Sequence, residues 1–341
     1  MSKLPDPAPV PVIAVIIPFF QREHGILARA LASIAAQQYP AGSLYVLVID
    51  DGSPLPAADE LRALPPPAGL RVRVITQPNA GPNEARNRGL DSLEPGTALV
   101  AYLDSDDEWM GDHLGRAVRI LTGPSASAPG PSAYFANLYH LGDDIDEYSK
   151  ARRVDPQQHT MLDGDATLRA YDGDMVHQIA TANIVFMPSL VIAVARLGRA
   201  RFPQGHRHGG GDYLYWMDLI VHGARFAFST VPEVRCGRGI NMWYGSGWGT
   251  DGLALRLLDE ARFRRRVLRE YATAPATKQA LRSRLAELQA GMLQDMVHRL
   301  RRRKPVNWSV LATFFRANPP SAAMVGKMVS TFAAAVGGRR P

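Results

Sequence analysis

The sequence predicts an α/β protein with a doubly wound, mixed sheet flanked by helices and a C-terminal helical appendage. Two observations support this fold class. Four short segments have the length and composition of sheet strands: 12–17, 44–49, 71–76 and 98–103. Helical patterns separate them, and this alternation is typical of parallel strands joined by right-handed crossovers.

The helices expected between these strands follow from the spacing of their apolar residues. Leu27, Leu31 and Ile34 recur at helical spacing within 26–34, and a second helix is predicted at 83–93. Farther along the chain, the sequence predicts strands at 133–140 and 181–188 and then a helix that ends at Leu197.

An acidic segment directly follows the fourth predicted strand. Asp104 and Asp106 occupy alternate positions of an extended segment and therefore project to the same side, whereas Asp107 points elsewhere. Two carboxylates in this arrangement suit a divalent cation, Mn²⁺ or Mg²⁺, that also binds the phosphate oxygens of a nucleotide. The alternative is a solvated acidic turn that caps a helix beginning near Trp109.

Further polar residues fall where predicted strands end. Pro18 follows the first strand, and Asp50 and Asp51 follow the second. In doubly wound sheets, ligands bind beyond the carboxyl ends of the strands. We therefore expect these residues and the acidic segment to line a single site.

Four segments together resemble the ordered motif set of family 2 glycosyltransferases. They are Val15-Ile16-Ile17-Pro18, Val48-Ile49-Asp50-Asp51-Gly52-Ser53, Gly81-Pro82-Asn83-Glu84-Ala85-Arg86-Asn87-Arg88-Gly89 and Leu103-Asp104-Ser105-Asp106-Asp107. The resemblance implies a GT-A fold and an inverting transfer from a nucleotide diphosphate sugar, with a UDP-sugar as the leading donor. In it, Asp104 and Asp106 are similar to the residues that hold the metal and the diphosphate.

The same resemblance implies further nucleotide contacts. Pro18 and Asp51 are similar to residues beside the base, where a carboxylate accepts a hydrogen bond from the imide N–H of uracil. Asp50 and Arg86 resemble nucleotide-binding positions, as does Asp104. The residues alone also fit purely structural roles, because an Asp-Gly-Ser turn accounts for Asp50 and Asp51, and a solvated helix charge accounts for Arg86.

The catalytic base of this family commonly belongs to a Glu-Asp pair that opens a helix, and the best match is Asp212. The preceding residue here is Gly211 rather than Glu, so the match is incomplete. By this resemblance Asp212 takes the proton of the acceptor hydroxyl, whereas the residues alone also allow a helix N-cap after a glycine run. His206 and His208 are expected to be loop residues without a ligand, and metal ligation is the alternative.

Two helices are predicted near the C-terminus. The first spans 252–272, and the second carries an apolar stripe suited to burial against the catalytic domain or a partner: Leu281, Leu285, Leu288, Met292 and Met296. A short amphipathic segment follows, marked by Trp308, Leu311, Ala312 and Phe315. We therefore assign 1–251 to a catalytic domain, with a nucleotide-binding part at 11–122 and an acceptor part at 131–251, and 252–341 to a basic helical extension.

Positive charge is concentrated in that extension. After Asp295 there are nine basic residues and no acidic one, and because the whole chain carries +7, residues 1–295 carry −2. A basic run at 301–304 beside an apolar segment favours an anionic membrane surface. The alternatives are a solvated helical appendage and contact with nucleic acid. We do not predict a nucleic-acid partner, because no recognition motif accompanies the charge.

Composition indicates a cytoplasmic enzyme, and the basic extension adds the expectation that it is peripheral at the inner face of the cell membrane. The single cysteine, Cys236, excludes an internal disulfide, and the sequence contains neither a secretory signal nor an apolar stretch of membrane-spanning length. Together with the metal site predicted from the residues, the family resemblance implies an inverting glycosyltransferase that acts on a hydroxyl of a saccharide or lipid-linked acceptor in surface polysaccharide synthesis. Alternatives are a sugar-phosphate nucleotidyltransferase and a non-catalytic nucleotide-sugar-binding module at the membrane surface.

Overall fold

The computed structural model describes residues 10–40, 42–123, 129–206, 209–237 and 247–320, together with Gly326. The chain divides into two compact units. The first comprises Met1–Gly173, Ile184–Phe202 and Asp218–Ile240, and the second comprises Asp174–Asn183, Pro203–Met217 and Asn241–Pro341. The domain boundary predicted at residue 251 stays a proposal.

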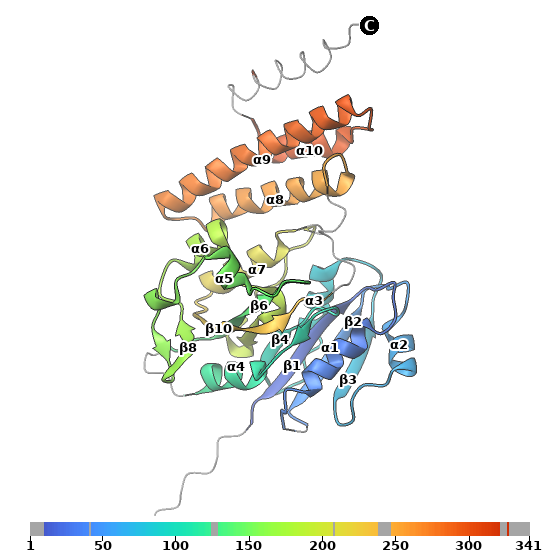
Figure 1. Cartoon of the computed structure of the whole chain (residues 1–341), viewed down its shortest axis with the longest axis vertical. Coiled ribbons are helices and arrows are strands. Elements are labelled where there is room, and N and C mark those ends of the chain that lie inside the picture. The colour runs from blue at the N-terminus through green and yellow to red at the C-terminus, as the bar shows by residue number, and fades with distance from the viewer. Residues whose placement is uncertain are drawn as a thin grey trace, which may run out of the picture. The chain divides into compact units, whose positions relative to one another are not determined.

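A ten-stranded sheet forms the core of the first unit (Figure 1). A short strand, β5 (Glu108–Trp109), pairs antiparallel with β10. The other strands follow one path across the sheet, in the order β3 (Arg71–Thr76), β2 (Leu44–Asp50), β1 (Val12–Phe19), β4 (Thr97–Tyr102), β9 (Val191–Ala193), β6 (Ala133–Tyr139), β10 (Phe226–Arg235), β8 (Asp165–Ala170) and β7 (Met161–Leu162). This mixed sheet with its flanking helices confirms the predicted fold class.

Strand β1 runs parallel to both of its neighbours, β2 and β4. The register places Phe19 opposite Asp50 and Ile16 opposite Tyr102, so the three strands end at the same edge of the sheet. Every residue of β2 is buried, as expected for a parallel strand covered on both faces. The four strands predicted in the first third of the chain are confirmed, with small differences at their ends.

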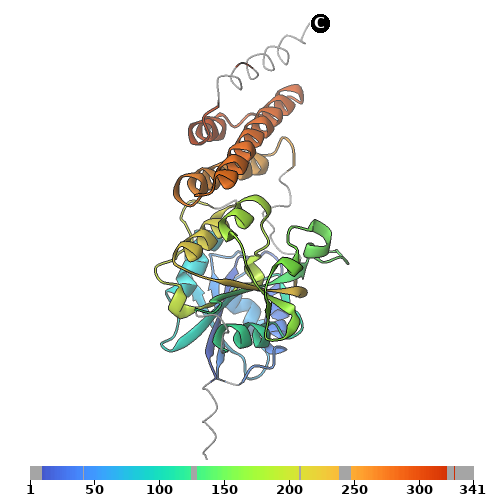
Figure 2. The ribbon, with the colours of Figure 1, turned by 90° about the vertical axis from the view of Figure 1, so that its left-hand side faces the viewer.

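Helices cover both faces of this part of the sheet, and the turned view of Figure 2 shows the same elements. Helices α1 and α4 pack in one apolar core with alternate residues of β1, among them Val15 and Ile17. Helix α3 packs on the opposite face, where a Cβ on Gly89 would lie 2.6 Å from Ile16 Cγ2. Glycine at this position therefore lets α3, which carries Arg86, approach β1 closely. Among the described residues, the α-helices that lie wholly in the first unit are α1 (Ile26–Ala35), α2 (Ala57–Ala63), α3 (Pro82–Leu90), α4 (His113–Thr122) and α5 (Glu147–Ala151).

Some predicted elements are wrong. The helix expected near Trp109 begins only at His113, because Trp109 itself belongs to β5. The strand predicted at 181–188 is also wrong, since helix α6 (Met175–Ala182) ends inside it and β9 begins only at Val191. The apolar run between them is buried but has irregular backbone, which an apolar run without periodicity cannot reveal. The helix expected through Leu197 is a single 3-10 turn, Val194–Arg196.

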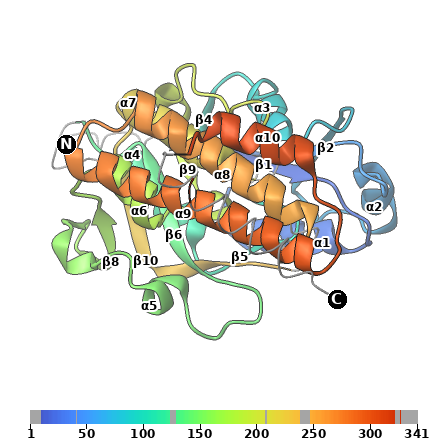
Figure 3. The same ribbon diagram turned by 90° about the horizontal axis from the view of Figure 1, so that it is seen from above.

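Three helices dominate the described part of the second unit, α8 (Asp251–Glu270), α9 (Pro275–Arg301) and α10 (Trp308–Ala317), and they lie side by side in Figure 3. The unit also includes α6 and the first part of α7 (Gly211–Val221). The predicted apolar stripe is confirmed as a buried face of α9, and Leu285, Leu288 and Met292 pack against α8 and α10. Burial of each such side chain contributes about 1.5–3 kcal/mol. The stripe therefore holds the helices of this unit together.

Helix α10 (Trp308–Ala317) covers the predicted amphipathic segment, and the residues it buries most fully are not among the four that mark that segment. Val310 and Phe314 are buried, Leu311 and Phe315 are partly buried, and Trp308 is 57% exposed. Phe314 belongs to the same apolar core as the facing residues of α8 and α9. Packing against α8 selects this face, because a short amphipathic pattern fits several neighbouring rotations of the helix.

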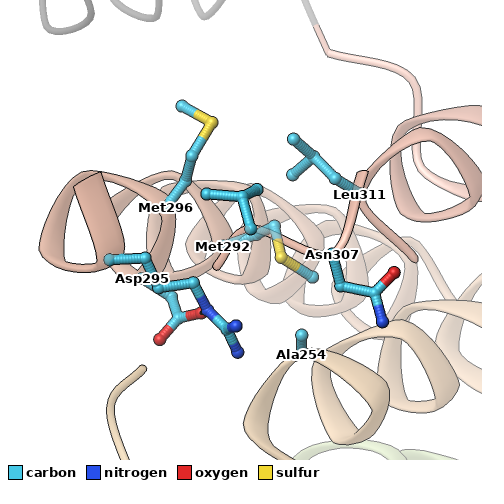
Figure 4. A pocket seen from close by; sticks show the side chains of 8 residues that line it. Ala254, Met292, Asp295, Met296, Asn307 and Leu311 are labelled. Atoms are coloured by element: carbon cyan, nitrogen blue, oxygen red, sulfur yellow. The ribbon is translucent and has the colours of Figure 1, made fainter. Parts of the chain in front are cut away.

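Arg299, one of the nine basic residues that follow Asp295, is buried, with 3% of its surface exposed. Its guanidinium pairs with Asp295 at 2.8 Å and Asp251 at 2.9 Å, and donates to the Pro305 carbonyl at 2.8 Å. Asp295 also accepts a hydrogen bond from the Gly249 backbone N–H at 2.6 Å. Arg299 therefore stabilises the second unit from within. Figure 4 shows the small pocket beside this pair, whose lining includes Ala254, Met292, Met296, Asn307 and Leu311.

Candidate active site

The candidate site lies where β2, β1 and β4 end. Strand β1 lies between the other two, and the chain passes from β1 outward to β2 and β3 before it returns to β4. In doubly wound sheets, ligands bind at the carboxyl ends of the strands where the order reverses in this way. Gln21 follows β1, Asp50 and Asp51 lie at the end of β2, and residues 104–107 follow β4. The structure therefore brings these residues to one edge of the sheet.

The Asp51 carboxylate is held by the loop after β3, and the residue is 3% exposed. Its Oδ1 accepts hydrogen bonds from Gln77 Nε2 at 2.7 Å and from the Ala80 backbone N–H at 2.8 Å. Its Oδ2 accepts one from the Gly81 backbone N–H at 2.7 Å. A carboxylate has about four lone-pair sites, and these bonds use three of them, so Oδ2 can accept one more donor.

Asp50 supports the turn that follows β2. Its Oδ1 accepts from the Ser53 backbone N–H and its Oδ2 from the Ala57 backbone N–H, each at 2.8 Å. Both oxygens thus hold the Asp-Gly-Ser turn and the start of α2, which is the alternative role that the sequence left open. Pro18 is half-buried opposite Ile49 within β1, one residue before that strand ends.

Arg86 reaches from α3 to the acidic turn. It is 7% exposed, and its Nη2 donates to Asp104 Oδ1 at 2.6 Å. Its Cζ lies 5.6 Å from the ring centre of Phe202, which Asn87 holds through two hydrogen bonds of 2.9 and 2.8 Å. Arg86 is therefore a buried, paired cation and not a solvated helix charge. Among the described residues, its Nε has no partner, so one donor is unused.

The acidic turn after β4 divides its carboxylates by exposure. Asp104 and Asp106 are half-buried, whereas Asp107 is 6% exposed and accepts a hydrogen bond from the Gly237 backbone N–H at 2.9 Å. Burial, together with the charges of Asp104 and Asp106, raises the pKa of Asp107 well above its usual range. A Cβ on Gly237 would overlap the Asp106 backbone carbonyl. Only glycine therefore allows the end of β10 to approach this turn.

Gln21 joins the three strand ends, a role that the sequence does not reveal. Its backbone N–H donates to Ser53 Oγ at 2.8 Å, and its side-chain amide donates to Ser105 Oγ at 2.9 Å. The residue is 4% exposed, and within the part of the chain that the structure describes its Oε1 has no partner. The only local feature that could have indicated a role for Gln21 in the site is its position just beyond the first strand. Phe202 and Gly237 have no such feature, because they come from segments distant in the sequence.

The acidic turn fits a divalent cation. Asp104 is half-buried, and its Oδ1 is paired with Arg86. Asp106 adds a second half-buried carboxylate two positions on. Across the described ranges, no group of three or more His, Cys, Asp or Glu side chains is placed to hold a metal. Mg²⁺ is commonly bound by one or two carboxylates together with substrate phosphates, and this pair fits that arrangement.

Asp212 lies in the second unit, in the first turn of α7. The helix begins at Gly211, so Asp212 is inside the helix, and its Oδ1 accepts from the Tyr213 backbone N–H at 3.0 Å. The residues at the sheet edge belong to the first unit, and Asp212 therefore stays a predicted base. His206 is half-buried before this helix, and burial lowers its pKa. His208 lies outside the described residues.

A parallel β3-β2-β1-β4 half, joined to a mixed second half and followed after β4 by an aspartate-rich turn, is the architecture of GT-A glycosyltransferases. Residues 14–187 match the model of glycosyl transferase family 2. The chain belongs to this family and is a glycosyltransferase. The resemblance drawn from the four sequence motifs is thereby confirmed.

Relatives and solved structures agree with this assignment. The succinoglycan biosynthesis protein ExoW of Rhizobium meliloti (strain 1021) is 30% identical over 314 residues, which are 90% of this chain and 94% of ExoW. S. aureus TarS 1-349 in complex with UDP-GlcNAc has a TM-score of 0.58 at 18% identity, over 90% of this chain and 82% of that chain. The mannosyltransferase PcManGT from Pyrobaculum calidifontis, in complex with GDP-Man and Mn²⁺, has a TM-score of 0.54 at 19% identity, over 98% of this chain and 83% of its own. These two structures share the fold.

Proposed function

We propose that this glycosyltransferase moves a sugar, with inversion, from a nucleotide diphosphate donor to a hydroxyl of a saccharide or lipid-linked acceptor. A UDP-sugar is the leading donor, since the TarS structure holds UDP-GlcNAc. The observation that carries the proposal is the continuous set of contacts at one sheet edge. Asp51 is bonded to the loop that leads into α3, and Arg86 on α3 is bonded to Asp104.

The nucleotide part of the donor binds along this set. Asp51 accepts the imide N–H of the base through the remaining site on Oδ2, and Pro18 flanks the base. Asp50 holds the turn that carries Asp51 in place. Arg86 supplies its unused donor and its charge to the diphosphate.

Asp104 and Asp106 hold a divalent cation, Mn²⁺ or Mg²⁺, and Asp104 also orients the nucleotide. When bound, such a cation neutralises the charge of the departing diphosphate. The Mn²⁺ in the PcManGT complex supports this choice of cofactor. Arg86 orients Asp104, because its guanidinium donates directly to that carboxylate.

Asp212 is the base that takes the proton of the acceptor hydroxyl as its oxygen attacks the donor. One displacement inverts the configuration at the sugar carbon. The catalytic domain spans 1–251, with a nucleotide-binding part at 11–122 and an acceptor part at 131–251, and the basic extension spans 252–341. ExoW is a succinoglycan biosynthesis protein, which supports a role in surface polysaccharide synthesis. We propose that this role is carried out on the cytoplasmic side of the membrane.

Thermal shift with nucleotide sugars tests the donor and the metal together. A ligand that binds only the native state stabilises it by about 2.7 kcal/mol at one hundred times its Kd. We expect a UDP-sugar to raise the Tm, and Mn²⁺ to increase that shift. Asp106→Asn should remove the manganese-dependent part, whereas Asp144→Asn, at an exposed acid outside the site, should retain it. A shift that is the same with EDTA would reject the metal role.

Product analysis separates this function from its alternatives. Transfer to an acceptor releases a nucleoside diphosphate. A sugar-phosphate nucleotidyltransferase would instead consume a nucleoside triphosphate and release pyrophosphate. A non-catalytic module would bind the donor and release nothing.

We also propose that the basic extension contacts an anionic membrane surface. Four basic residues at 301–304 are exposed, and Trp308 is 57% exposed beside them. Within the described ranges, no helix is long and apolar enough to cross a bilayer. The proposed contact depends on the surface charge and on Trp308, which suits the headgroup region.

Vesicle flotation tests the membrane contact. Each basic residue near an anionic surface contributes about 1 kcal/mol, so replacing Arg301, Arg302 and Arg303 together by Gln should weaken binding on the order of 10²-fold. Vesicles of phosphatidylcholine with and without phosphatidylserine supply the two surfaces. Arg282→Gln, at an exposed arginine of α9, is the control and should change little. Unchanged flotation of the triple variant would exclude this surface. Surface substitutions are preferable to truncation after Asp295, which would remove the buried Arg299 and Phe314.

A further inference from the structure

The segment that leads into the predicted base packs against helix α8, within the second unit. Gly210 precedes α7 with a φ of +83°, a left-handed conformation that favours glycine. A Cβ on Gly210 would overlap the Phe263 side chain of α8. The Gly210 carbonyl accepts the Leu214 N–H at 3.2 Å and so opens the helix that carries Asp212. The first turn of α7 is therefore built directly on Phe263.

A second contact comes from the residue after Asp212. The rings of Tyr213 and Phe263 have centroids 4.8 Å apart and planes inclined at 32°, and Tyr213 also contacts the Trp216 ring at 5.3 Å. Phe263 is 4% exposed and Trp216 is 1% exposed. Residues on both sides of Asp212 thus rest on the same aromatic side chain.

Helix α8 is itself fixed in place around Phe263. The neighbouring Arg264 donates to the Ala180 carbonyl of α6 at 2.8 Å and pairs with Glu260 at 2.9 Å. Glu260 also pairs with Arg284 of α9 at 2.9 Å. The support beneath the first turn of α7 is therefore tied to two further helices of the unit.

We propose that Phe263 is a positioning residue for Asp212, and that α8 thereby serves catalysis. This inference rests on the proposed role of Asp212 as the base. The sequence assigns α8 to an extension outside the catalytic domain. The contacts of Phe263, however, mean that α8 supports the turn that carries the base. A base must be held within a narrow range of positions, because a displacement of about 1 Å costs on the order of 10²-fold in rate.

Steady-state kinetics of two variants of α8 test the proposal. Phe263→Leu removes the ring face beneath Gly210 and Tyr213, and Phe263→Met is the second variant if the first melts below the assay temperature. Leu257→Ala is the matched control, because Leu257 is a buried residue of the same helix in the apolar core shared with α9 and α10. We expect Phe263→Leu to lower kcat by about 10- to 100-fold. The donor KM should stay within about threefold, since the proposed donor contacts come from other elements. Leu257→Ala should keep kcat within about threefold despite a lower Tm.

Three results would overturn the proposal. They are an unchanged kcat in the Phe263 variants, an equal fall in kcat in Leu257→Ala, and a rise in donor KM as large as the fall in kcat. Asp212→Asn separates this test from that of the proposed function. Full turnover by Asp212→Asn would reject the role of Asp212 as the base. Full turnover by Phe263→Leu, together with an inactive Asp212→Asn, would reject only the positioning role of Phe263.

Discussion

Replacing Asp212 by Asn should lower kcat by about 10²–10⁴-fold while donor binding is retained, because general-base catalysis contributes an effect of that size. The amide keeps the shape of the carboxylate and one accepting oxygen, so the hydrogen bond from the Tyr213 backbone N–H can persist. It has no basicity, so the acceptor hydroxyl keeps its proton. Release of nucleoside diphosphate in the presence of acceptor measures kcat, and titration calorimetry measures donor affinity.

The control for this variant is Asp218→Asn. Asp218 lies on the same helix and is also half-buried. Turnover by Asp218→Asn should stay within about threefold of the unmodified enzyme, which separates loss of the base from a general effect on α7. Full turnover by Asp212→Asn would reject its role as the base. Loss of donor binding in that variant would instead point to a role in the ground state.

Replacing Arg299 by Met should lower the free energy of unfolding by about 3–5 kcal/mol, the usual cost of removing one partner of a buried ion pair. Asp295 is 2% exposed and would lose the cation that pairs with it. Asp251 and the Pro305 carbonyl would lose their donor at the same time. Urea unfolding followed by the helical circular dichroism signal measures the loss.

Two further variants test whether the loss of stability in Arg299→Met is specific to the buried ion pair. Arg302→Met changes an exposed arginine close by and should stay within about 0.5 kcal/mol. The double variant Asp295→Leu/Arg299→Met removes both charges and should cost less than Arg299→Met alone, because no buried charge is left unpaired. The remaining cost of the double variant reports the lost acceptor of the Gly249 N–H together with the lost donors to Asp251 and to the Pro305 carbonyl. An Arg299→Met cost as small as that of Arg302→Met would contradict the buried pair.

Much of the fold could be predicted because its signals are local. The apolar runs of β1, β2 and β4 and the stripe of α9 are visible within single segments, and burial is their direct consequence. The same reasoning failed where a buried apolar segment does not form a regular strand or helix. Ile184 and Val185 are buried in irregular backbone, where the sequence predicted a strand.

The acidic and basic residues of the candidate site were found from the sequence, but their partners were not. Asp51, Arg86 and Asp104 stood in recognisable motifs at strand and helix ends. Nothing local indicated that the loop after β3 would hold Asp51, or that Gln21 would bridge the turns after β2 and β4. These partners depend on which strands become neighbours, and that follows from the order of the whole sheet.

The amino-acid sequence was sufficient to determine the fold class, most strand and helix segments and the identity of the acidic motifs. These features can be predicted because periodicity and motif spacing extend over only a few residues. The tertiary contacts alone decide that Arg299 is an internal cation, that Gly237 must lack a side chain, and that Phe263 lies under the turn of Asp212. The physical reason is that burial and pairing depend on segments far apart in sequence, whose approach only the folded chain determines.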